Sequence, residues 1–145
     1  MSRRKGSVIS QTRPCDAAIP ANRVVQWSGS NVGNVTITTV VGSLLIAGVS
    51  EEGSNQSATS PPNWYVKVTQ AGIVQIEMLT GTAIAHGDKL KIADTAGRIT
   101  SIAGAAAGAG TLTGIVGIAQ SAHASGDATG TLVDVLLTPG LQMFT

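Results

Sequence analysis

Few residues of the chain have types and spacings that suit catalysis. The sequence contains two histidines, His86 and His123, and His86 stands two positions before Asp88. A serine would complete a hydrolase set of Ser, His and Asp with them, but polar residues around a glycine are also typical of a turn, and we favour the turn. Two histidines without a pair of thiols do not predict a zinc site. The sequence therefore predicts no enzyme, no bound metal and no cofactor.

Glycine-rich stretches and the single cysteine indicate no other chemistry. In Gly108–Gly114 the third glycine falls one position too late for a dinucleotide-binding fingerprint, and no glycine loop is followed by Gly-Lys-Ser/Thr. Cys15 has no second cysteine to pair with, which excludes an intramolecular disulfide. Stability is therefore expected to come from packing and association.

The composition predicts one domain with a surface poor in charge. The chain has 145 residues, which is close to the usual size of one domain, and only 12% of them are charged, against about 25% in an average domain. The net charge of +1 does not favour nucleic acid as a partner. Large apolar residues are too sparse in Ile99–Gly126 for a membrane span. Such a surface favours contact with other copies or partner proteins, the alternative being a small neutral β domain.

Positive charge is concentrated at the N-terminus. Residues 1–23 contain five basic residues and one acid, whereas residues 24–145 contain four basic residues and seven acids. Residues 1–17 show no hydrophobic periodicity, so we expect an extended basic arm that anchors electrostatically to a partner. A leader that only aids solubility is the alternative. The candidate anchors are Arg3, Arg4, Lys5 and Arg13.

The rest of the chain alternates short strand patterns with turn residues. β-Branched residues dominate 35–41, and apolar and polar residues alternate in 64–69 and 73–79. Further expected strands are 24–27, 44–49, 90–93, 98–102, 111–120 and 132–137. No segment shows helical periodicity over ten residues. The sequence therefore predicts an all-β fold, a small β-barrel or sandwich over 18–140 followed by a tail at 141–145.

The second half of the chain resembles the first half in order and spacing. The matching segments are 19–25 with 84–90, 46–50 with 115–119, and 65–68 with 132–135, at offsets of 65, 69 and 67 residues. Few identities are retained, but the spacing is. We therefore expect one domain built from two similar β half-units.

Aromatic residues are scarce, so the core must be aliphatic. The aromatic residues are Trp27, Trp64, Tyr65 and Phe144. Because aromatic residues are enriched at interfaces, Trp27, Trp64 and Tyr65 are candidate interface anchors, with a core role for at least one tryptophan as the alternative. The polar stretch 51–63 is long for a loop and is expected to be either an interaction loop or a mobile one.

Several motifs together resemble the capsid cement, or decoration, proteins of tailed bacteriophages. In the second half they are Ala83–Leu90 (AIAHGDKL), Asp94–Ile99 (DTAGRI), Gly114–Ala119 (GIVGIA), Ala124–Asp127 (ASGD) and Val133–Gly140 (VDVLLTPG). In the first half, Ile19–Val25 (IPANRVV) and Ile46–Glu51 (IAGVSE) also fit. The resemblance covers roughly residues 18–140, and the stretch 51–63 departs from the family pattern.

The resemblance implies a non-enzymatic virion protein. Proteins of this family are similar to the head-decoration protein of phage lambda, with a β-tulip or β-clip core, and assemble as trimers on the outer surface of the expanded capsid. There they bind the major capsid protein and stabilise the shell against the pressure of the packaged DNA. The chain's residues leave open an alternative, a phage tail or surface module that binds a glycan or a host receptor. In that case Trp64 and Tyr65 would form a stacking platform.

Overall fold

The computed structural model describes residues 9–37, 45–57, 63–102 and 112–143, which form β-strands joined by turns. The strands of the described residues are β1 (Ile9–Cys15), β2 (Arg23–Trp27), β3 (Val35–Ile37), β4 (Ile46–Ser50), β5 (Ser54–Gln56), β6 (Trp64–Ala71), β7 (Ile73–Glu77), β8 (Lys89–Ile92), β9 (Ile99–Ser101), β10 (Leu112–Ala119) and β11 (Leu132–Met143). The prediction of an all-β protein is confirmed.

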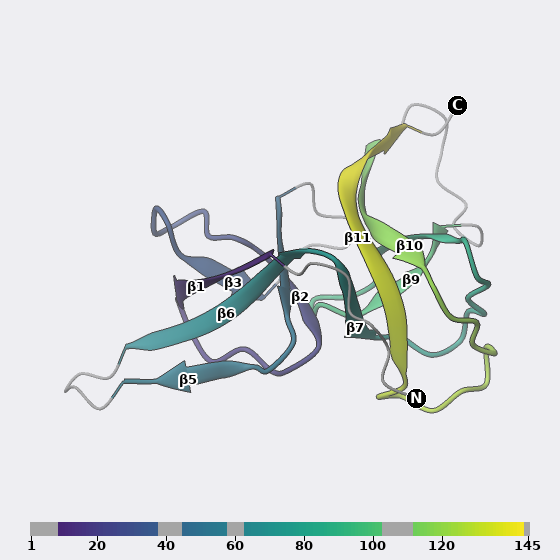
Figure 1. The fold of residues 1–145 in the computed structure, drawn as a ribbon, viewed down its shortest axis with the longest axis horizontal. Helices are drawn as coiled ribbons and strands as arrows, with labels where there is room; N and C mark the ends of the chain where they lie inside the picture. The colour runs from purple at the N-terminus through teal and green to yellow at the C-terminus, as the bar shows by residue number, and fades with distance from the viewer. Residues whose placement is uncertain (1–8, 38–44, 58–62, 103–111, 144–145) are drawn as a thin grey trace.

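The strands form two units that follow one another along the chain (Figure 1). Strands β1 to β6 form a sheet in the order β1-β3-β2-β4-β6-β5, and a further pairing of β1 with β6 closes five of them into a barrel, which we call barrel A. Strands β7 to β11 form a sheet in the order β7-β11-β10-β8-β9. A parallel bridge between Met78 and Ile99 joins the two edges of this second sheet, which we call barrel B.

The two half-units predicted from the sequence are confirmed by the strand order. Strands β3-β2-β4-β6 of barrel A correspond to β9-β8-β10-β11 of barrel B, and β1 corresponds to β7. The registers agree as well: Val25 lies opposite Gly48 in barrel A, and Leu90 lies opposite Gly117 in barrel B. These pairs are related by the same offsets of 65 and 69 residues that the sequence repeat shows. The repeat is therefore a repeat of strand pairing.

Two glycines at equivalent positions allow neighbouring strands to approach closely. A Cβ atom added at Gly48 would lie 2.4 Å from the carbonyl oxygen of Thr69, and one added at Gly117 would lie 2.2 Å from that of Leu136. Both distances are far below van der Waals contact. Because the obstructing atoms belong to the backbone, no side-chain rotation would relieve the overlap. Each barrel therefore requires a glycine at this position.

The barrels pack directly against each other through the outer face of barrel A. On β2 and β4, Val25 and Gly48 face one side of the sheet, so their neighbours Val24 and Val49 face the other. Val24 and Val49 are fully buried and belong to the hydrophobic core of barrel B. Thr69, which lies opposite Val49 on β6, is also buried. We call the row Val24–Val49–Thr69 the A face.

Polar contacts fix the orientation of this junction. The Glu77 carboxylate pairs with the Arg23 guanidinium of barrel A and lies 3.5 Å from Nε of Arg98. Arg98 in turn pairs with Asp94 at 3.0 Å, and all four side chains are mostly buried. Removing one partner from such a network would leave an uncompensated buried charge. The network therefore disfavours sliding of one barrel on the other.

The expected N-terminal boundary at residue 18 differs from the structure. β1 pairs antiparallel with β6 along its whole length, from Ile9 to Cys15, and so belongs to barrel A. The sequence pattern did not indicate this strand because polar residues, Gln11 and Arg13, occupy the same face as the buried Cys15. Only residues 1–8 of the expected arm precede the strand, and they lie outside the described residues.

The expected C-terminal boundary is also different. β11 continues past the expected end at residues 138–140 and pairs with β10 as far as Met143. Pro139 is accommodated because the register shifts next to it, between the Gly117–Leu137 and Ile115–Gly140 pairs. Residues 38–41, 44 and 111 were expected to be strand and lie outside the described residues.

We expect Gly48→Ala and Gly117→Ala each to lower the free energy of unfolding by roughly 2–4 kcal/mol, because the new Cβ atom meets a backbone carbonyl. Urea denaturation measures this. Gly126→Ala is the matched control, since a Cβ atom there meets nothing within 4 Å. Equal effects of the three substitutions would contradict the close approach.

Candidate interaction surfaces

Arg13 belongs to the folded barrel. It lies opposite the buried Val66 of β6, on the same face of β1 as Cys15. Its guanidinium lies 5.3 Å from the centroid of the Trp27 ring and donates a hydrogen bond to the side-chain oxygen of Gln11. A cation over an indole ring is attracted by the ring quadrupole. Arg13 therefore stabilises barrel A, which differs from the free anchor expected from the sequence. The other expected anchors, Arg3, Arg4 and Lys5, lie outside the described residues.

The two tryptophans flank the core of barrel A. Trp27, Val35, Cys15 and Trp64 lie in one row across β2, β3, β1 and β6. Val35 and Cys15 are buried, and the half-buried tryptophans pack against the core cluster that contains both. Burial raises the pKa of the Cys15 thiol, and the neighbouring Asp16 carboxylate raises it further, so this thiol is a poor nucleophile. The structure supports a core role for both tryptophans.

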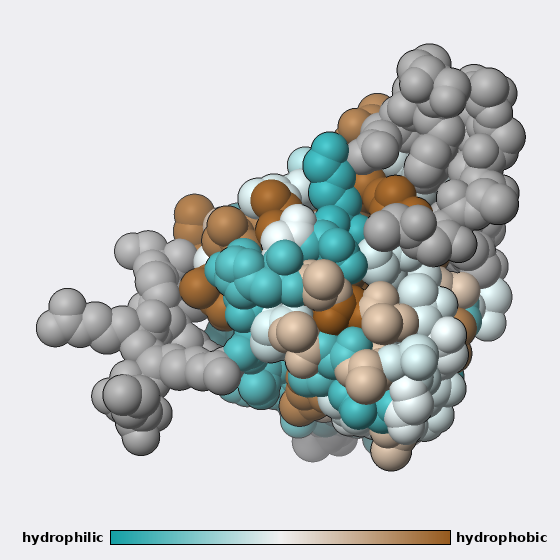
Figure 2. Space-filling view, turned by 90° about the vertical axis from the view of Figure 1, so that its right-hand side faces the viewer, coloured by the Kyte–Doolittle hydropathy of each residue, from teal (hydrophilic) through white to brown (hydrophobic). Residues whose placement is uncertain are grey.

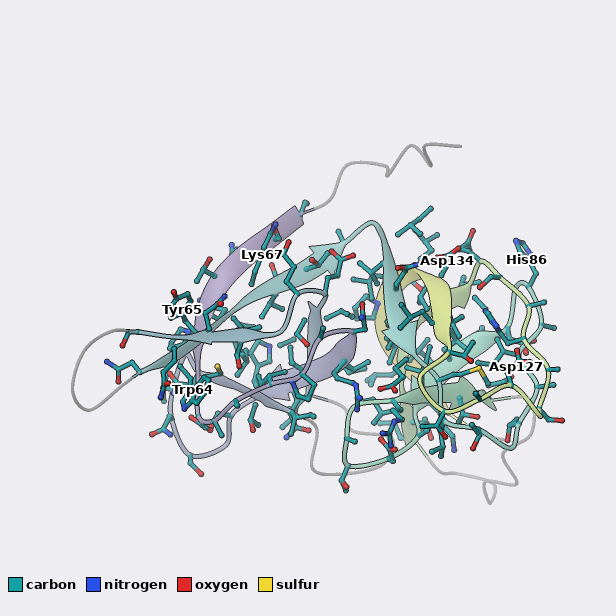
Figure 3. All side chains as sticks on the ribbon, turned by 90° about the horizontal axis from the view of Figure 1, so that it is seen from below. Trp64, Tyr65, Lys67, His86, Asp127 and Asp134 are labelled. Carbon is teal, nitrogen blue, oxygen red and sulfur yellow. The ribbon has the colours of Figure 1, made fainter. Side chains whose placement is uncertain are left out.

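Tyr65 lies on the outer face of barrel A. Successive residues of a strand point to opposite sides, and Tyr65 is 40% exposed whereas Trp64 packs against the core (Figure 3). The two side chains therefore face opposite sides of β6 and do not form the joint platform considered for a glycan-binding module. The exposed Tyr65 is flanked by Pro14 of β1 and Asn55 of β5, and Lys67 follows it on the same outer face.

Asp16 holds the turn between β2 and β3. Its carboxylate accepts hydrogen bonds from the Ser28 hydroxyl at 2.6 Å and from the amides of Asn31 and Asn34 at 2.8 Å each. These bonds, that of Ser28 first, lower the pKa of Asp16. We call residues 28–34 the A tip. Within the A tip, Val32 is fully exposed.

His86 and Asp88 form a turn, as the sequence indicates. The Asp88 carboxylate accepts hydrogen bonds from the Ala85 amide at 2.9 Å and from the Ser101 hydroxyl at 2.8 Å. His86 is exposed on the same turn. The carboxylate is thus engaged by the turn and by β9, and these contacts give it a structural role.

A second Ser, His and Asp grouping was missed from the sequence. Nε2 of His123 lies 2.9 Å from the Ser121 hydroxyl, and Nδ1 lies 3.4 Å from the Asp127 carboxylate. The Ser121 oxygen also accepts a hydrogen bond from the Asp134 amide, and Asp127 accepts one from the Ala124 amide. The Ser121 end of the grouping therefore joins the loop after β10 to β11. The Asp127 end closes a turn within that loop. The spacing S-x-H-x-x-x-D was the sequence signal for it.

Barrel B carries an exposed row at the position equivalent to the A face. Lys89, Ile118, Leu136 and Ile73 lie side by side across β8, β10, β11 and β7. Leu136 is 36% exposed, Ile118 and Ile73 are half-buried, and Lys89 is exposed. Figure 2, which turns barrel B toward the viewer, shows hydrophilic and hydrophobic residues interspersed over this side of the molecule. We call the row Lys89–Ile118–Leu136 the B face.

In the described part of the chain, no three His, Cys, Asp or Glu side chains are grouped as a metal site would require. No helix there has the length and apolar character needed to cross a membrane. In comparisons with known proteins, no family model matches the chain and no curated protein matches it significantly.

We expect Arg13→Ala to lower the free energy of unfolding by about 1–2 kcal/mol, because the contact with Trp27 and the packing of the side-chain stem are both lost. Urea denaturation followed by tryptophan emission measures this. Lys67→Ala is the control, since it removes an exposed cation from the neighbouring strand. A loss no larger than that of Lys67→Ala would contradict a structural role for Arg13.

The lowered pKa of Asp16 predicts a pH dependence of stability. The folded state favours the ionised carboxylate, so the contribution of Asp16 is complete above the ordinary pKa of 3.8 and is lost as the pH falls through the lowered value. We expect Asp16→Asn to lower the urea midpoint at pH 7 and to flatten its fall between pH 4 and pH 2. Glu52→Gln, at an exposed acid, is the control. Parallel pH profiles for wild type and Asp16→Asn would contradict the assignment.

Proposed function

We propose that the chain is a non-enzymatic virion protein that decorates the outside of an icosahedral phage head. It binds the lattice of the major capsid protein as a cement and associates with further copies of itself as a homotrimer. The observation that carries the proposal is that the five second-half motifs resembling phage cement proteins form paired strands and turns of barrel B.

These motifs are neighbours in barrel B although they are far apart in the sequence. Ala83–Leu90 and Ala124–Asp127 run side by side, because Ile84 and His123 exchange backbone hydrogen bonds of 2.9 and 2.8 Å. The motif Gly114–Ala119 pairs with the end of the first motif and with β11. The pairing of these motifs with one another agrees with the resemblance.

The surface suits contact with a protein lattice. Only 12% of the residues are charged, and charged residues are depleted from the cores of protein interfaces. Weak contacts repeated over a shell give strong overall binding without high affinity at a single site. A protein of this kind needs no catalytic group, and the polar groupings around Asp88 and Ser121 have structural partners.

The basic residues Arg3, Arg4 and Lys5 would add an electrostatic contact with the shell. In the sequence they lie shortly before β1, which begins at Ile9 and pairs with β6 over seven residues. A contact made by these residues would therefore act on the whole of barrel A. Because surface charge contacts are screened, this part of the binding should weaken as salt is added.

Co-sedimentation with expanded phage heads that lack the protein tests the proposal. We expect saturable binding of the full chain at a fixed ratio to the major capsid protein. The triple variant Arg3→Ala/Arg4→Ala/Lys5→Ala should bind more weakly and with less dependence on salt, whereas Lys67→Ala should bind as the wild type does. A truncation at residue 18 would be unsuitable because it removes β1; deletion of residues 2–6 keeps barrel A complete.

Failure of the full chain to bind heads at both low and physiological salt would overturn the proposal. Binding to immobilised glycans under the same conditions would then favour a receptor-binding module. Full binding by the triple variant would leave the cement role in place and would exclude an anchoring role for the three basic residues.

A further inference from the structure

The junction between the barrels has an equivalent position in each half of the chain, and among the described residues the position on barrel A is the one covered by the other barrel. On the A face, Val24 and Val49 enter the core of barrel B, and Thr69 beside them is buried with its hydroxyl bonded to Glu51. At the offsets of the repeat, the B face occupies the same positions on barrel B, with Lys89, Ile118 and Leu136 in place of these residues. The B face is exposed in the single chain.

The A face binds a hairpin turn of the other barrel. The turn between β8 and β9 places the carbonyl of Gly97 2.9 Å from the amide of Val24, and the carbonyl of Ala96 accepts a hydrogen bond from Arg23 at 3.0 Å. Gly97 approaches so closely that a Cβ atom there would lie 2.6 Å from the Val24 carbonyl oxygen. This turn therefore fits against the A face through its backbone.

Barrel A carries an equivalent turn that is one residue longer, and its side-chain partner in the described residues is Asp16 of the same barrel. The A tip joins β2 to β3 as the turn at Gly97 joins β8 to β9, and Gly33 has a φ of +85° where Gly97 has +73°. A Cβ atom at Gly33 would meet nothing within 4 Å, and the neighbouring Val32 is fully exposed. Within the part of the chain that the structure describes, barrel A thus presents an exposed tip and barrel B presents a partly exposed face.

We propose that the B face of one copy binds the A tip of a second copy, so that the junction inside the chain is repeated between chains. The contact joins two different surfaces, so each copy has one of each to offer and the assembly proceeds head to tail into a ring or a filament. The inference rests on the internal repeat and not on capsid binding, although a closed ring of three copies would be the trimer of the proposed function.

Charge complementarity favours this occupant. The outer face of β8 carries Lys91 beside the B face. The carboxylate of Asp16, whose pKa is lowered, lies next to the A tip and bonds three of its residues. Inside the chain, the position of Lys89 is held by the apolar Val24. We therefore expect the contact between chains to be weaker than the internal junction and to depend on concentration and salt.

Light scattering after size exclusion, over a range of concentrations, tests the contact. We expect the wild type to associate with increasing concentration, and Leu136→Glu and Val32→Glu each to shift the chain to monomer. Leu141→Glu is the matched control, because Leu141 is another exposed leucine of β11 and lies outside the B face. Urea denaturation of each variant separates loss of association from loss of folding.

Cross-linking identifies the surfaces. Val32→Cys and Lys89→Cys replace residues at the positions of Ala96 and Val24. In the internal junction Ala96 bonds Arg23, the residue before Val24, and Gly97 bonds Val24 itself. A mixture of the two variants should form dimers with a short bismaleimide, while each variant alone should not. The buried Cys15 leaves the wild type as the background control.

A wild type that stays monomeric at its highest soluble concentration would overturn the inference. The inference would also be overturned if Leu141→Glu abolished association and Leu136→Glu did not. Efficient cross-linking of Lys89→Cys alone would indicate a contact between two identical faces instead. If the chain associates with itself but does not bind phage heads, the proposed function is contradicted and the contact between copies is not.

Discussion

The structure depends on two strands that are buried on both sides. In β2 and β4, Val25 and Gly48 face the interior of barrel A, while Val24 and Val49 enter the core of barrel B. Neither face can take a polar side chain without a partner, because an unpaired buried polar group is costly. These strands therefore fix the distance and orientation between the barrels. The position of the A tip follows from them.

Much of the fold could be predicted from the sequence because the repeat preserves strand register. The offsets of 65, 69 and 67 residues relate not only the strands but also their partners, as the Val25–Gly48 and Leu90–Gly117 pairs show. Alternation of apolar and polar residues then located β6 and β7, since one side of each strand is packed and the other meets solvent. Local patterns were sufficient where the two sides of a strand differ.

Local patterns failed where a polar residue packs inward or the partner is distant in the sequence. β1 escaped prediction because Arg13 lies on its inner side, where Trp27 supplies a face for the guanidinium. Its partner strand begins about fifty residues later, and no local pattern specifies such a pairing. The grouping of Ser121 with His123 and Asp127 was missed for another reason: its geometry depends on the turn held by the Ala124 amide.

The two halves of the chain differ most informatively where their environments differ. Outward positions of a strand that faces only water are usually polar, and Gln75 and Lys89 on barrel B follow that rule. Ile118 and Leu136 do not follow it, although water reaches both in the single chain. Of the equivalent positions on barrel A, Val49 is covered by the neighbouring barrel and Thr69 is buried. Barrel B therefore keeps apolar residues at positions where barrel A is covered. A barrel of a second copy, packed on Ile118 and Leu136, best accounts for them.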